Sequence, residues 1–333
     1  MSLHPEDYVA VIPAAGVGVR LRPHTHTLPK ALINVAGRPI LAHILDGLLE
    51  QGVRRFVLVV GYMGDRIRDY LAERYRLDVT FIEQEFRKGL GHAIYLTRDA
   101  VGNAPSLIVL GDTIVQTDYG NFLTSEDVVI GVKEVDDPRR FGIVETAGGF
   151  VRHLVEKPET PASNLAIVGI YGIPRSDLLF GALHRLIDAG ATTKGEYQLT
   201  DALEGMLADG VRMRTQLVDG WFDCGKQETL LQTNRHLLNG LPAPRPRPGV
   251  ILVPPVFVDD LAEVEASILG PYVSVARGAV VRRSILRDSI VNENATVEDL
   301  LLESSVVGEN AVVKGFSQSL NVGDSSEIRP FER

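Results

Sequence analysis

Over the first part of the chain, short runs of apolar residues alternate with longer stretches in which apolar positions recur every three or four residues. The runs are typical of buried strands, and the periodic stretches are typical of amphipathic helices. Strands alternating with helices predict an α/β fold with a mostly parallel sheet and helices on both faces. Ligands of such sheets bind beyond the carboxyl ends of the strands. We expect strands over residues 8–12, 56–60, 79–82 and 107–110, and helices over residues 40–49, 63–75 and 91–100.

The middle of the chain continues this pattern with shorter apolar runs. We interpret residues 1–240 as one domain, to which this region contributes a second half. Its expected strands are residues 128–132, 142–145 and 166–171, and its expected helices are residues 176–187, 199–207 and 226–238.

Prolines crowd residues 241–250, which predicts a stiff linker without regular structure. Beyond it, residues 251–333 lack a helical pattern and repeat every sixteen residues, as in Val275, Val291 and Val307. Such a repeat favours a short β-solenoid of about four coils, similar to the left-handed β-helices of hexapeptide-repeat proteins, over an ordinary antiparallel β domain. Because the solenoid has open edges, we expect it to pack on the first domain or on a second subunit. We also expect the chain to form a homo-oligomer. The other repeated positions are Ala279, Ala295 and Ala311, and Val281, Val297 and Val313.

Composition narrows the possible partners. The 333 residues carry a net charge of −9, which argues against a nucleic-acid-binding surface. Cys224 is the only cysteine, so no intrachain disulfide forms, which fits a reducing cytoplasm. No apolar run reaches the roughly 20 residues needed to span a bilayer, and the amino terminus lacks a signal-peptide core. We therefore expect a cytoplasmic protein without a membrane partner.

The stretch from residue 8 to residue 40 carries the most chemistry. A small-residue loop, Ala14-Ala15-Gly16-Val17-Gly18, follows the first strand, and its glycines allow backbone N–H groups to approach a phosphate. Taken alone, Gly-x-Gly also fits an ordinary loop beside solvated cations. It is not a Walker A loop, because no Gly-Lys-Ser/Thr follows, and Pro23 and Pro29 interrupt the helix that a dinucleotide-binding fingerprint requires.

The whole string resembles the opening of the sugar-1-phosphate nucleotidylyltransferases: Gly16-Val17-Gly18-Val19-Arg20-Leu21-Arg22-Pro23-His24-Thr25, then Pro29-Lys30 and Gly37-Arg38-Pro39. The resemblance covers residues 8–238 and implies a Rossmann-like catalytic domain, a nucleoside triphosphate and a sugar-1-phosphate as substrates, and Mg²⁺ as cofactor. Val19 departs from the family pattern, which has Thr or Ser there. A carboxy-terminal β-helix also occurs in members of this family.

The reaction implied by the resemblance is attack of a sugar phosphate oxygen on the α-phosphorus of the triphosphate. Such a reaction needs alignment of anionic groups and neutralisation of the charge that builds at the α-phosphate. Arg20 and Lys30 are the expected catalytic cations: Arg20 at the β- and γ-phosphates, Lys30 at the α-phosphate or the sugar phosphate. The loop residues Ala14, Ala15, Gly16 and Gly18 are expected to bind the nucleotide.

Asp112 and Asp223 match the metal-binding aspartates of the family. Each follows an apolar run, where a lone acid is usually part of a turn. Mg²⁺ is commonly held by one or two carboxylates, with waters and phosphate oxygens completing the shell. Their spacing along the chain does not show that the two acids meet. His24 and His26, in a loop without a third ligand, are a poor metal pair.

The segment Glu83–Ala93 is expected to read the base. A glutamine amide both donates and accepts hydrogen bonds, so Gln84 can pair with a pyrimidine imide. The resemblance places the base-reading glutamine at Gln84 and a close-approach glycine at Gly89. His92 is expected to begin a helix near the base rather than act as a general base, because phosphate nucleophiles are already ionised at pH 7.

Glu156-Lys157-Pro158 is the clearest motif for the sugar, although Glu-Lys is also a common exposed ion pair. In the family the acid binds sugar hydroxyls and the lysine binds the sugar phosphate. Gly142 and Ile167 lie in segments that resemble the strands framing the sugar. Gly195-Glu196 and Thr200-Asp201 resemble a further segment near it.

Three functions stay open at this point. The first is an Mg²⁺-dependent enzyme that makes dTDP-glucose or UDP-glucose. The second is a uridylyltransferase acting on N-acetylglucosamine-1-phosphate or another sugar-1-phosphate, without a solenoid acetyltransferase, since residues 250–333 contain no histidine. The third is a non-catalytic regulatory subunit that binds a nucleotide sugar.

Overall fold

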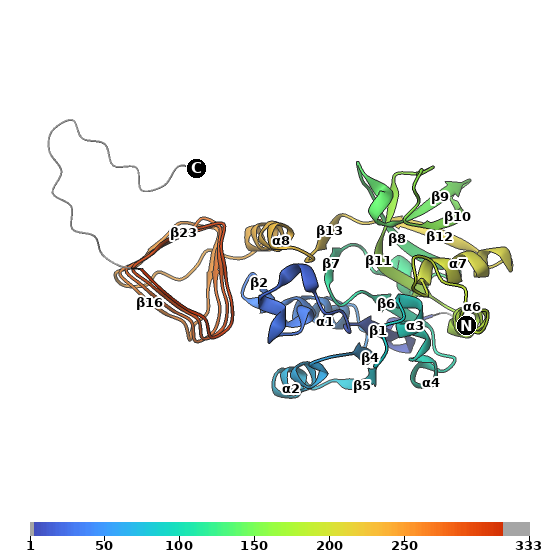
Figure 1. The fold of residues 1–333 in the computed structure, drawn as a ribbon, viewed down its shortest axis with the longest axis horizontal. Coiled ribbons are helices and arrows are strands. Elements are labelled where there is room, and N and C mark those ends of the chain that lie inside the picture. Colours follow the sequence, from blue (N-terminus) through green and yellow to red (C-terminus); the bar gives the residue numbers. More distant parts are fainter. Residues whose placement is uncertain (1–2, 316–333) are drawn as a thin grey trace. The chain divides into compact units, whose positions relative to one another are not determined.

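The computed structural model describes residues 3–315, and the chain folds into two compact units, Met1–Leu237 and Leu238–Arg333 (Figure 1). Each unit has its own apolar core. Residues 241–250 contain no helix or strand, while the expected domain limits at residues 240 and 250 stay predictions. None of the helices in the described part of the chain is long and apolar enough to cross a membrane.

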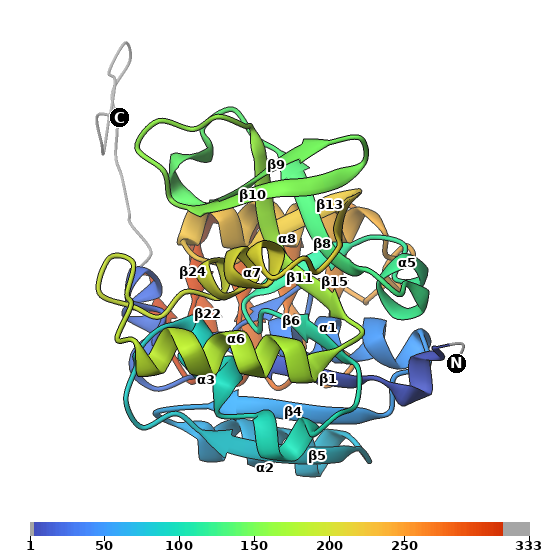
Figure 2. The same ribbon diagram turned by 90° about the vertical axis from the view of Figure 1, so that its right-hand side faces the viewer.

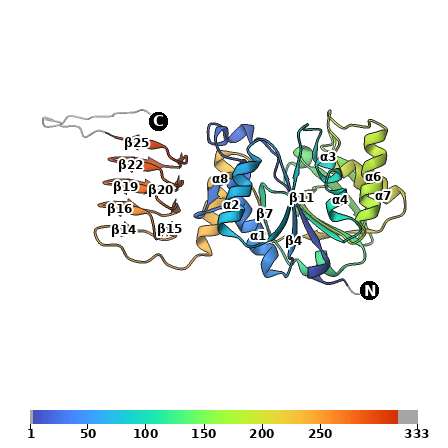
Figure 3. The same cartoon turned by 90° about the horizontal axis from the view of Figure 1, so that it is seen from below.

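The first unit is built on a nine-stranded sheet in which β5, β4, β1 and β6 lie side by side and parallel. These strands are β1 (Val9–Pro13), β4 (Arg55–Val60), β5 (Asp78–Glu83) and β6 (Ser106–Val109). The expected α/β fold is confirmed, because helices cover both faces (Figure 3). One face carries α1 (Ile40–Glu50), α2 (Gly64–Arg74) and α8 (Gln227–Asn239); the other carries α3 (Leu90–Tyr95), α4 (Arg98–Val101), α6 (Ser176–Asp188) and α7 (Leu199–Ala208).

The long strand β11 (Leu165–Ile173) changes the direction of the sheet. It runs antiparallel to β6, β8 (Val128–Glu134) and β9 (Gly142–Ala147). A hairpin of β9 and β10 (Phe150–Glu156) forms the end of the sheet opposite β5 (Figure 2), and β12 (Met213–Leu217) pairs with β8. The second half of the sheet is therefore mixed.

Several short elements complete this unit. β7 (Thr113–Gln116) and β13 (Gly220–Asp223) form a separate antiparallel pair, and β2 (Asn34–Val35) pairs with β3 (Arg38–Pro39). The prediction of one continuous helix over residues 91–100 was wrong. The chain forms two short helices, α3 and α4, with a break around Thr97, whose hydroxyl donates to the carbonyl of Ile94. The remaining helical elements are α5 (Gly120–Thr124) and the 3₁₀ turns Pro5–Asp7, Val19–Leu21, His24–His26, Lys30–Leu32 and Pro138–Arg140.

The second unit is the predicted left-handed β-helix, which is triangular in cross-section (Figure 1). Up to residue 315, four coils form three parallel four-stranded sheets around a core that includes Leu269, Val281 and Val297. The first sheet is β14 (Ile251–Leu252), β17 (Ile268–Leu269), β20 (Ile285–Arg287) and β23 (Leu301–Glu303). The second is β15 (Val256–Val258), β18 (Val273–Val275), β21 (Ile290–Val291) and β24 (Val306–Val307). The third is β16 (Glu263–Glu265), β19 (Val280–Arg282), β22 (Thr296–Glu298) and β25 (Val312–Lys314).

The repeat is not uniform along the β-helix. Ile285 pairs with Leu301, sixteen residues on, but Ile268 pairs with Ile285, seventeen residues on. The extra residue lies in the corner around Gly270, because Ser274, beyond that corner, already pairs with Ile290 at the shorter step. The valine repeat seen in the sequence therefore describes the later coils only.

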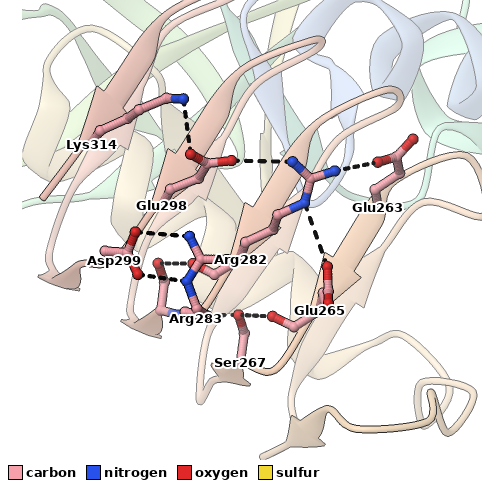
Figure 4. A network of polar contacts seen from close by, with 9 residues as sticks. Glu263, Glu265, Ser267, Arg282, Arg283, Glu298, Asp299 and Lys314 are labelled. Atoms are coloured by element: carbon pink, nitrogen blue, oxygen red, sulfur yellow. Dashed lines mark hydrogen bonds and ion pairs between the residues drawn. The ribbon is translucent and has the colours of Figure 1, made fainter.

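The third sheet of the β-helix carries a ladder of alternating charges on its outer face (Figure 4). Arg282 lies 3.0 Å from Glu263 and 3.1 Å from Glu298, whose other oxygen lies 2.9 Å from Lys314. At the adjoining corner, Arg283 makes two hydrogen bonds to Asp299. Opposite charges directly across parallel strands support the stacking of the coils.

Candidate active site

The loop that follows β1 lies where the topology predicts a ligand, at the carboxyl ends of the parallel strands. The N–H of Ala14 donates to the carbonyl of Val59 over 2.7 Å, and the N–H of Gly111 donates to the carbonyl of Pro13 over 3.0 Å. The start of the loop is thus fixed between the ends of β4 and β6.

A cavity of about 530 Å³ opens beside this loop. Eight of the residues predicted to bind nucleotide, metal or phosphate line it: Ala14, Ala15, Gly16, Arg20, Lys30, Gln84, Gly89 and Asp112. Gly18 is not among them, because it packs inward, where a Cβ would lie 2.9 Å from the methyl group of Thr25. The side chain of Val19 is exposed and also lies outside the lining.

Lys30 is buried between the two predicted metal ligands. Its Nζ lies 2.6 Å from Asp112 Oδ2 and 3.9 Å from Asp223 Oδ1. The lysine side chain is 7% exposed, while the two aspartates keep 42% and 36% of their side-chain surface open. The structure therefore brings together one cation and two acids that are far apart in the sequence, and it leaves both carboxylates accessible to a ligand.

Two short strands place the aspartates. β7 begins just after Asp112 and β13 ends with Asp223, and Thr113 pairs with Asp223 in this antiparallel pair. Burial, and then the charge of Asp112, raise the pKa of Asp223, while Lys30, Arg20 and Lys226 act in the opposite direction. Two carboxylates this close need a neighbouring cation in order to stay ionised together.

Arg20 approaches Asp223 from the turn after the loop. Its Nη2 would lie 2.8 Å from a Cβ at Gly225, and the Asp223 carboxylate oxygens would lie 2.9 Å from that same point. Within the described part of the chain, the guanidinium makes no hydrogen bond or ion pair within 4 Å. Arg20 is therefore a cation at the cavity that has no fixed protein partner.

The donor set of Asp112 and Asp223 fits a hard divalent cation. Carboxylate oxygens are the ligands that Mg²⁺ prefers, and it commonly takes only one or two of them from the protein. Among residues 3–315, no group of three or more His, Cys, Asp or Glu side chains is arranged to hold a metal ion. The pair would therefore hold Mg²⁺ only together with water and phosphate oxygens.

Gln84 and Gly89 also line the cavity. The Gln84 side chain is buried, and its Nε2 lies 3.2 Å from the Gly89 carbonyl oxygen and 3.3 Å from His92 Nδ1. Gly89 has a φ of +104°, and a Cβ there would lie 2.6 Å from the carbonyl oxygen of Tyr197. This position therefore excludes a side chain for both conformational and steric reasons.

The four residues predicted to bind the sugar phosphate come together around the β9–β10 hairpin. Gly142 pairs with Glu156, and a Cβ on Gly142 would lie 2.9 Å from Glu156 Oε2 and 3.1 Å from Ile167 Cδ1. The hydroxyl of Thr200 donates to Glu156 Oε2 over 2.7 Å, and Lys157 Nζ lies 3.0 Å from Glu156 Oε1. This cluster does not line the nucleotide cavity.

Aromatic packing joins β13, which carries Asp223, to the residues predicted to bind the sugar. The ring of Trp221 in β13 packs edge-on against Phe141, with centroids 4.9 Å apart, and Phe141 directly precedes Gly142. The strand that carries Asp223 therefore also contacts the residue that precedes β9.

Arg87 was not predicted from the sequence, and Glu196 was expected near the sugar. Both residues line the cavity beside the loop after β1. Glu196 is drawn there because the N–H of Tyr197 donates to the Lys88 carbonyl and the N–H of Gly91 donates to the Tyr197 carbonyl. No local pattern signals Arg87, whose position depends on the exposed loop between Gln84 and Gly89.

The family model described as nucleotidyl transferase matches residues 9–240. Glucose-1-phosphate thymidylyltransferase of Streptomyces griseus is 32% identical over 321 residues, covering 86% of this chain and 88% of that protein. Low-salt glycan biosynthesis nucleotidyltransferase Agl11 of Haloferax volcanii is 35% identical over 238 residues, covering 68% of this chain and 65% of that protein. The match therefore spans slightly less than two thirds of the length of Agl11.

Among solved structures, a putative glucose-1-phosphate thymidylyltransferase from Bacillus anthracis in complex with a sucrose has a TM-score of 0.62. The two sequences are 25% identical, and the match covers 72% of this chain and 98% of that one. A UDP-glucose pyrophosphorylase complexed with UDP-glucose has a TM-score of 0.61 at 23% identity, covering 70% of this chain and 99% of that one, and shows the shared fold.

Proposed function

The chain belongs to the nucleotidyl transferase family, and from that premise we propose that it transfers a nucleotidyl group from dTTP or UTP to glucose-1-phosphate. The products are dTDP-glucose or UDP-glucose and pyrophosphate. The observation that carries the proposal is the position of Lys30 between Asp112 and Asp223 at the edge of a cavity lined by the loop 14–16. A regulatory subunit without catalysis has no need for this cluster.

In the proposed reaction, an oxygen of the sugar phosphate attacks the α-phosphorus, and the bond to the β-phosphate breaks. The attacking phosphate is already ionised near pH 7, so no general base is required. Lys30 is assigned to the α-phosphate or the sugar phosphate, and Arg20 to the β- and γ-phosphates and the departing pyrophosphate. When bound, Mg²⁺ would neutralise phosphate charge beside Asp112 and Asp223.

Substrate recognition is divided between the two clusters. Gln84 and Gly89 are assigned to the base, and the loop residues Ala14, Ala15 and Gly16 to the nucleotide, with the backbone N–H groups of Ala15 and Gly16 as donors. Gly142, Glu156 and Ile167 are assigned to the sugar, with Lys157 at its phosphate. The Glu156 side chain is only 10% exposed and already accepts a hydrogen bond from Thr200, so its carboxylate is held ready for sugar hydroxyls. Gly18 is assigned to the shape of the phosphate loop, because it packs on Thr25.

The proposal extends to the setting of the enzyme. We assign it to the cytoplasm and expect a homo-oligomer, with Mg²⁺ as cofactor and with no nucleic acid or membrane as a partner. The net charge of −9 supports the exclusion of nucleic acid. The open coil edges of the β-helix support self-association. Sedimentation of the full chain gives the subunit number directly.

A pyrophosphate-release assay tests the function. dTTP and UTP are each paired with glucose-1-phosphate, mannose-1-phosphate and N-acetylglucosamine-1-phosphate, with Mg²⁺ present or chelated. We expect turnover with glucose-1-phosphate that stops on chelation. Preferred use of N-acetylglucosamine-1-phosphate would instead support the uridylyltransferase alternative. Absence of turnover, and of Mg²⁺-linked triphosphate binding in thermal-shift titrations, would favour the regulatory subunit.

A further inference from the structure

The side-chain amide of Gln84 is held from two directions at the edge of the nucleotide cavity. Its Nε2 lies 3.2 Å from the carbonyl oxygen of Gly89 and 3.3 Å from Nδ1 of His92. A carbonyl oxygen only accepts hydrogen bonds, so the amide nitrogen, and not the amide oxygen, faces it. Gln84 Oε1 takes no hydrogen bond from any described residue and is the atom left for a ligand.

His92 can accept the second amide hydrogen only as a neutral imidazole with its proton on Nε2. Burial, and then the charge of Lys88, lower the pKa of His92 below the ordinary 6.5. The ring is therefore neutral at pH 7, and its Nδ1 is an acceptor. Each hydrogen of the Gln84 amide then has a partner inside the protein, which opposes rotation of the amide.

A glutamine held in this orientation distinguishes between pyrimidines. Uracil and thymine carry an imide N–H, which donates to an oxygen such as Gln84 Oε1. Cytosine has an unprotonated nitrogen at the same place, and its lone pair would face the lone pairs of Oε1. A freely rotating amide would serve both bases, because turning it presents an N–H in place of the oxygen. A site that presents a fixed acceptor to the base strongly rejects a base that lacks the matching donor.

We propose that His92 is a positioning residue that fixes the Gln84 amide and thereby selects imide bases over cytosine. This inference rests on the proposed function, since it concerns the triphosphate that the enzyme uses. It assigns His92 no contact with the substrate and no proton transfer. Its effect is carried by the orientation of Gln84 alone.

The test uses variants at position 92 that separate the effect of the imidazole ring from the effect of its hydrogen-bond acceptor. His92→Phe keeps a planar ring without an acceptor, His92→Leu provides a second acceptor-free variant, and His92→Asn restores an acceptor near the Nδ1 position. The readout is the ratio of kcat/KM for UTP to that for CTP, with glucose-1-phosphate held constant. We expect the ratio to fall about five-fold in the Phe and Leu variants, as the loss of one hydrogen bond predicts, and to recover in the Asn variant. A purely structural role would lower both rates together and leave the ratio unchanged.

Calorimetric binding of UTP and CTP with Mg²⁺ separates this inference from the proposed function. If the wild-type chain releases no pyrophosphate but binds UTP more tightly than CTP, the proposed function fails, and the variants are then judged by the ratio of the two Kd values. Phe and Leu variants that fold, as judged by melting, and keep the wild-type ratio would overturn the role of His92. Wild-type protein that binds the two triphosphates equally, or binds neither, would overturn it as well.

Discussion

Asp112 and Asp223 are joined through the backbone as well as through Lys30. The N–H of Cys224, next to Asp223, donates to the carbonyl oxygen of Asp112 over 3.2 Å. Because β7 and β13 are antiparallel, the pair Thr113–Asp223 fixes both carboxylates at the same end of the two strands. The distance between the acids is therefore set by strand pairing rather than by flexible loops, which is the kind of support that a metal site needs.

The first prediction concerns these two acids. Asp112→Asn and Asp223→Asn each remove the charge of a proposed metal ligand, so we expect the transfer rate to fall roughly 10²-fold or more and the Mg²⁺ concentration for half-maximal rate to rise. Pyrophosphate release at varied Mg²⁺ measures both. Asp219→Asn, at an exposed acid just before β13, is the matched control and should behave as wild type. Near-normal turnover in both ligand variants would reject the metal assignment.

Arg20 and Arg22 provide a second comparison within one short segment. Arg20 lines the cavity, whereas Arg22 is exposed and does not. Arg20→Met removes charge stabilisation from the departing pyrophosphate, and we expect kcat to fall by about 10²–10³. Arg22→Met should leave kcat unchanged. Steady-state kinetics with triphosphate as the varied substrate measure both variants, and equal losses would show that only the general positive charge of the segment matters.

The sequence predicted the elements that carry strong periodicity. The helix over α1 and the strands β1, β4, β5 and β6 were found because their apolar residues recur regularly or form uninterrupted runs. β7 and β13 were missed because each has only four residues, and their pairing joins segments that are far apart in the chain. Local pattern carries no information about such a pairing.

The candidate site follows the same division. The cations, the acids and Gln84 were identified from motifs, but the spacing of Asp112 and Asp223 did not show that they meet at Lys30. The placement of Glu196 beside Gly89 depends on backbone hydrogen bonds between residues 88–91 and Tyr197. In the β-helix, the extra residue at the Gly270 corner interrupts the sixteen-residue spacing. The repeat seen in the sequence therefore covers only the later coils.

A third prediction separates the sugar cluster from the nucleotide cavity. In Gly142→Ala, the new methyl group would lie 2.9 Å from Glu156 Oε2, which Thr200 holds in place, so the carboxylate must move. We expect KM for the sugar phosphate to rise roughly ten-fold, as overpacking of this kind predicts, while KM for the triphosphate stays unchanged. An equal rise in both KM values would place Gly142 outside a dedicated sugar site.

Gly205→Ala is the control for Gly142→Ala. Gly205 lies inside α7, and a Cβ there would meet nothing within 4 Å. Replacing a glycine inside a helix stabilises a protein by roughly 0.5–1 kcal/mol, so the melting temperature should rise and both KM values should stay at the wild-type level. The pair distinguishes the effect of a methyl group at the sugar cluster from that of losing any glycine.

The last prediction concerns the charge ladder of the β-helix and its dependence on pH. Hydrogen bonds from Lys314 and then Arg282 lower the pKa of Glu298 below its ordinary value of 4.5. A group whose pKa is lowered by folding stabilises the folded state above its unfolded pKa, and that stabilisation is lost as the pH falls through the folded value. Arg282→Gln removes one partner, so we expect its melting temperature to lie below that of wild type at pH 7 and to approach it near the acid limit of Glu298 titration.

The size and specificity of this effect are also set by the structure. Arg282 faces Glu263, Glu265 and Glu298, so its loss leaves like charges along one face of the sheet. Because all these groups are partly solvated, the loss of melting temperature should become smaller with added salt. Arg277→Gln, at an exposed corner of the same coil, is the matched control and should melt with wild type at every pH. A deficit in Arg282→Gln that persists unchanged at low pH would mean that the arginine stabilises the coils through the packing of its aliphatic chain and not through its charge.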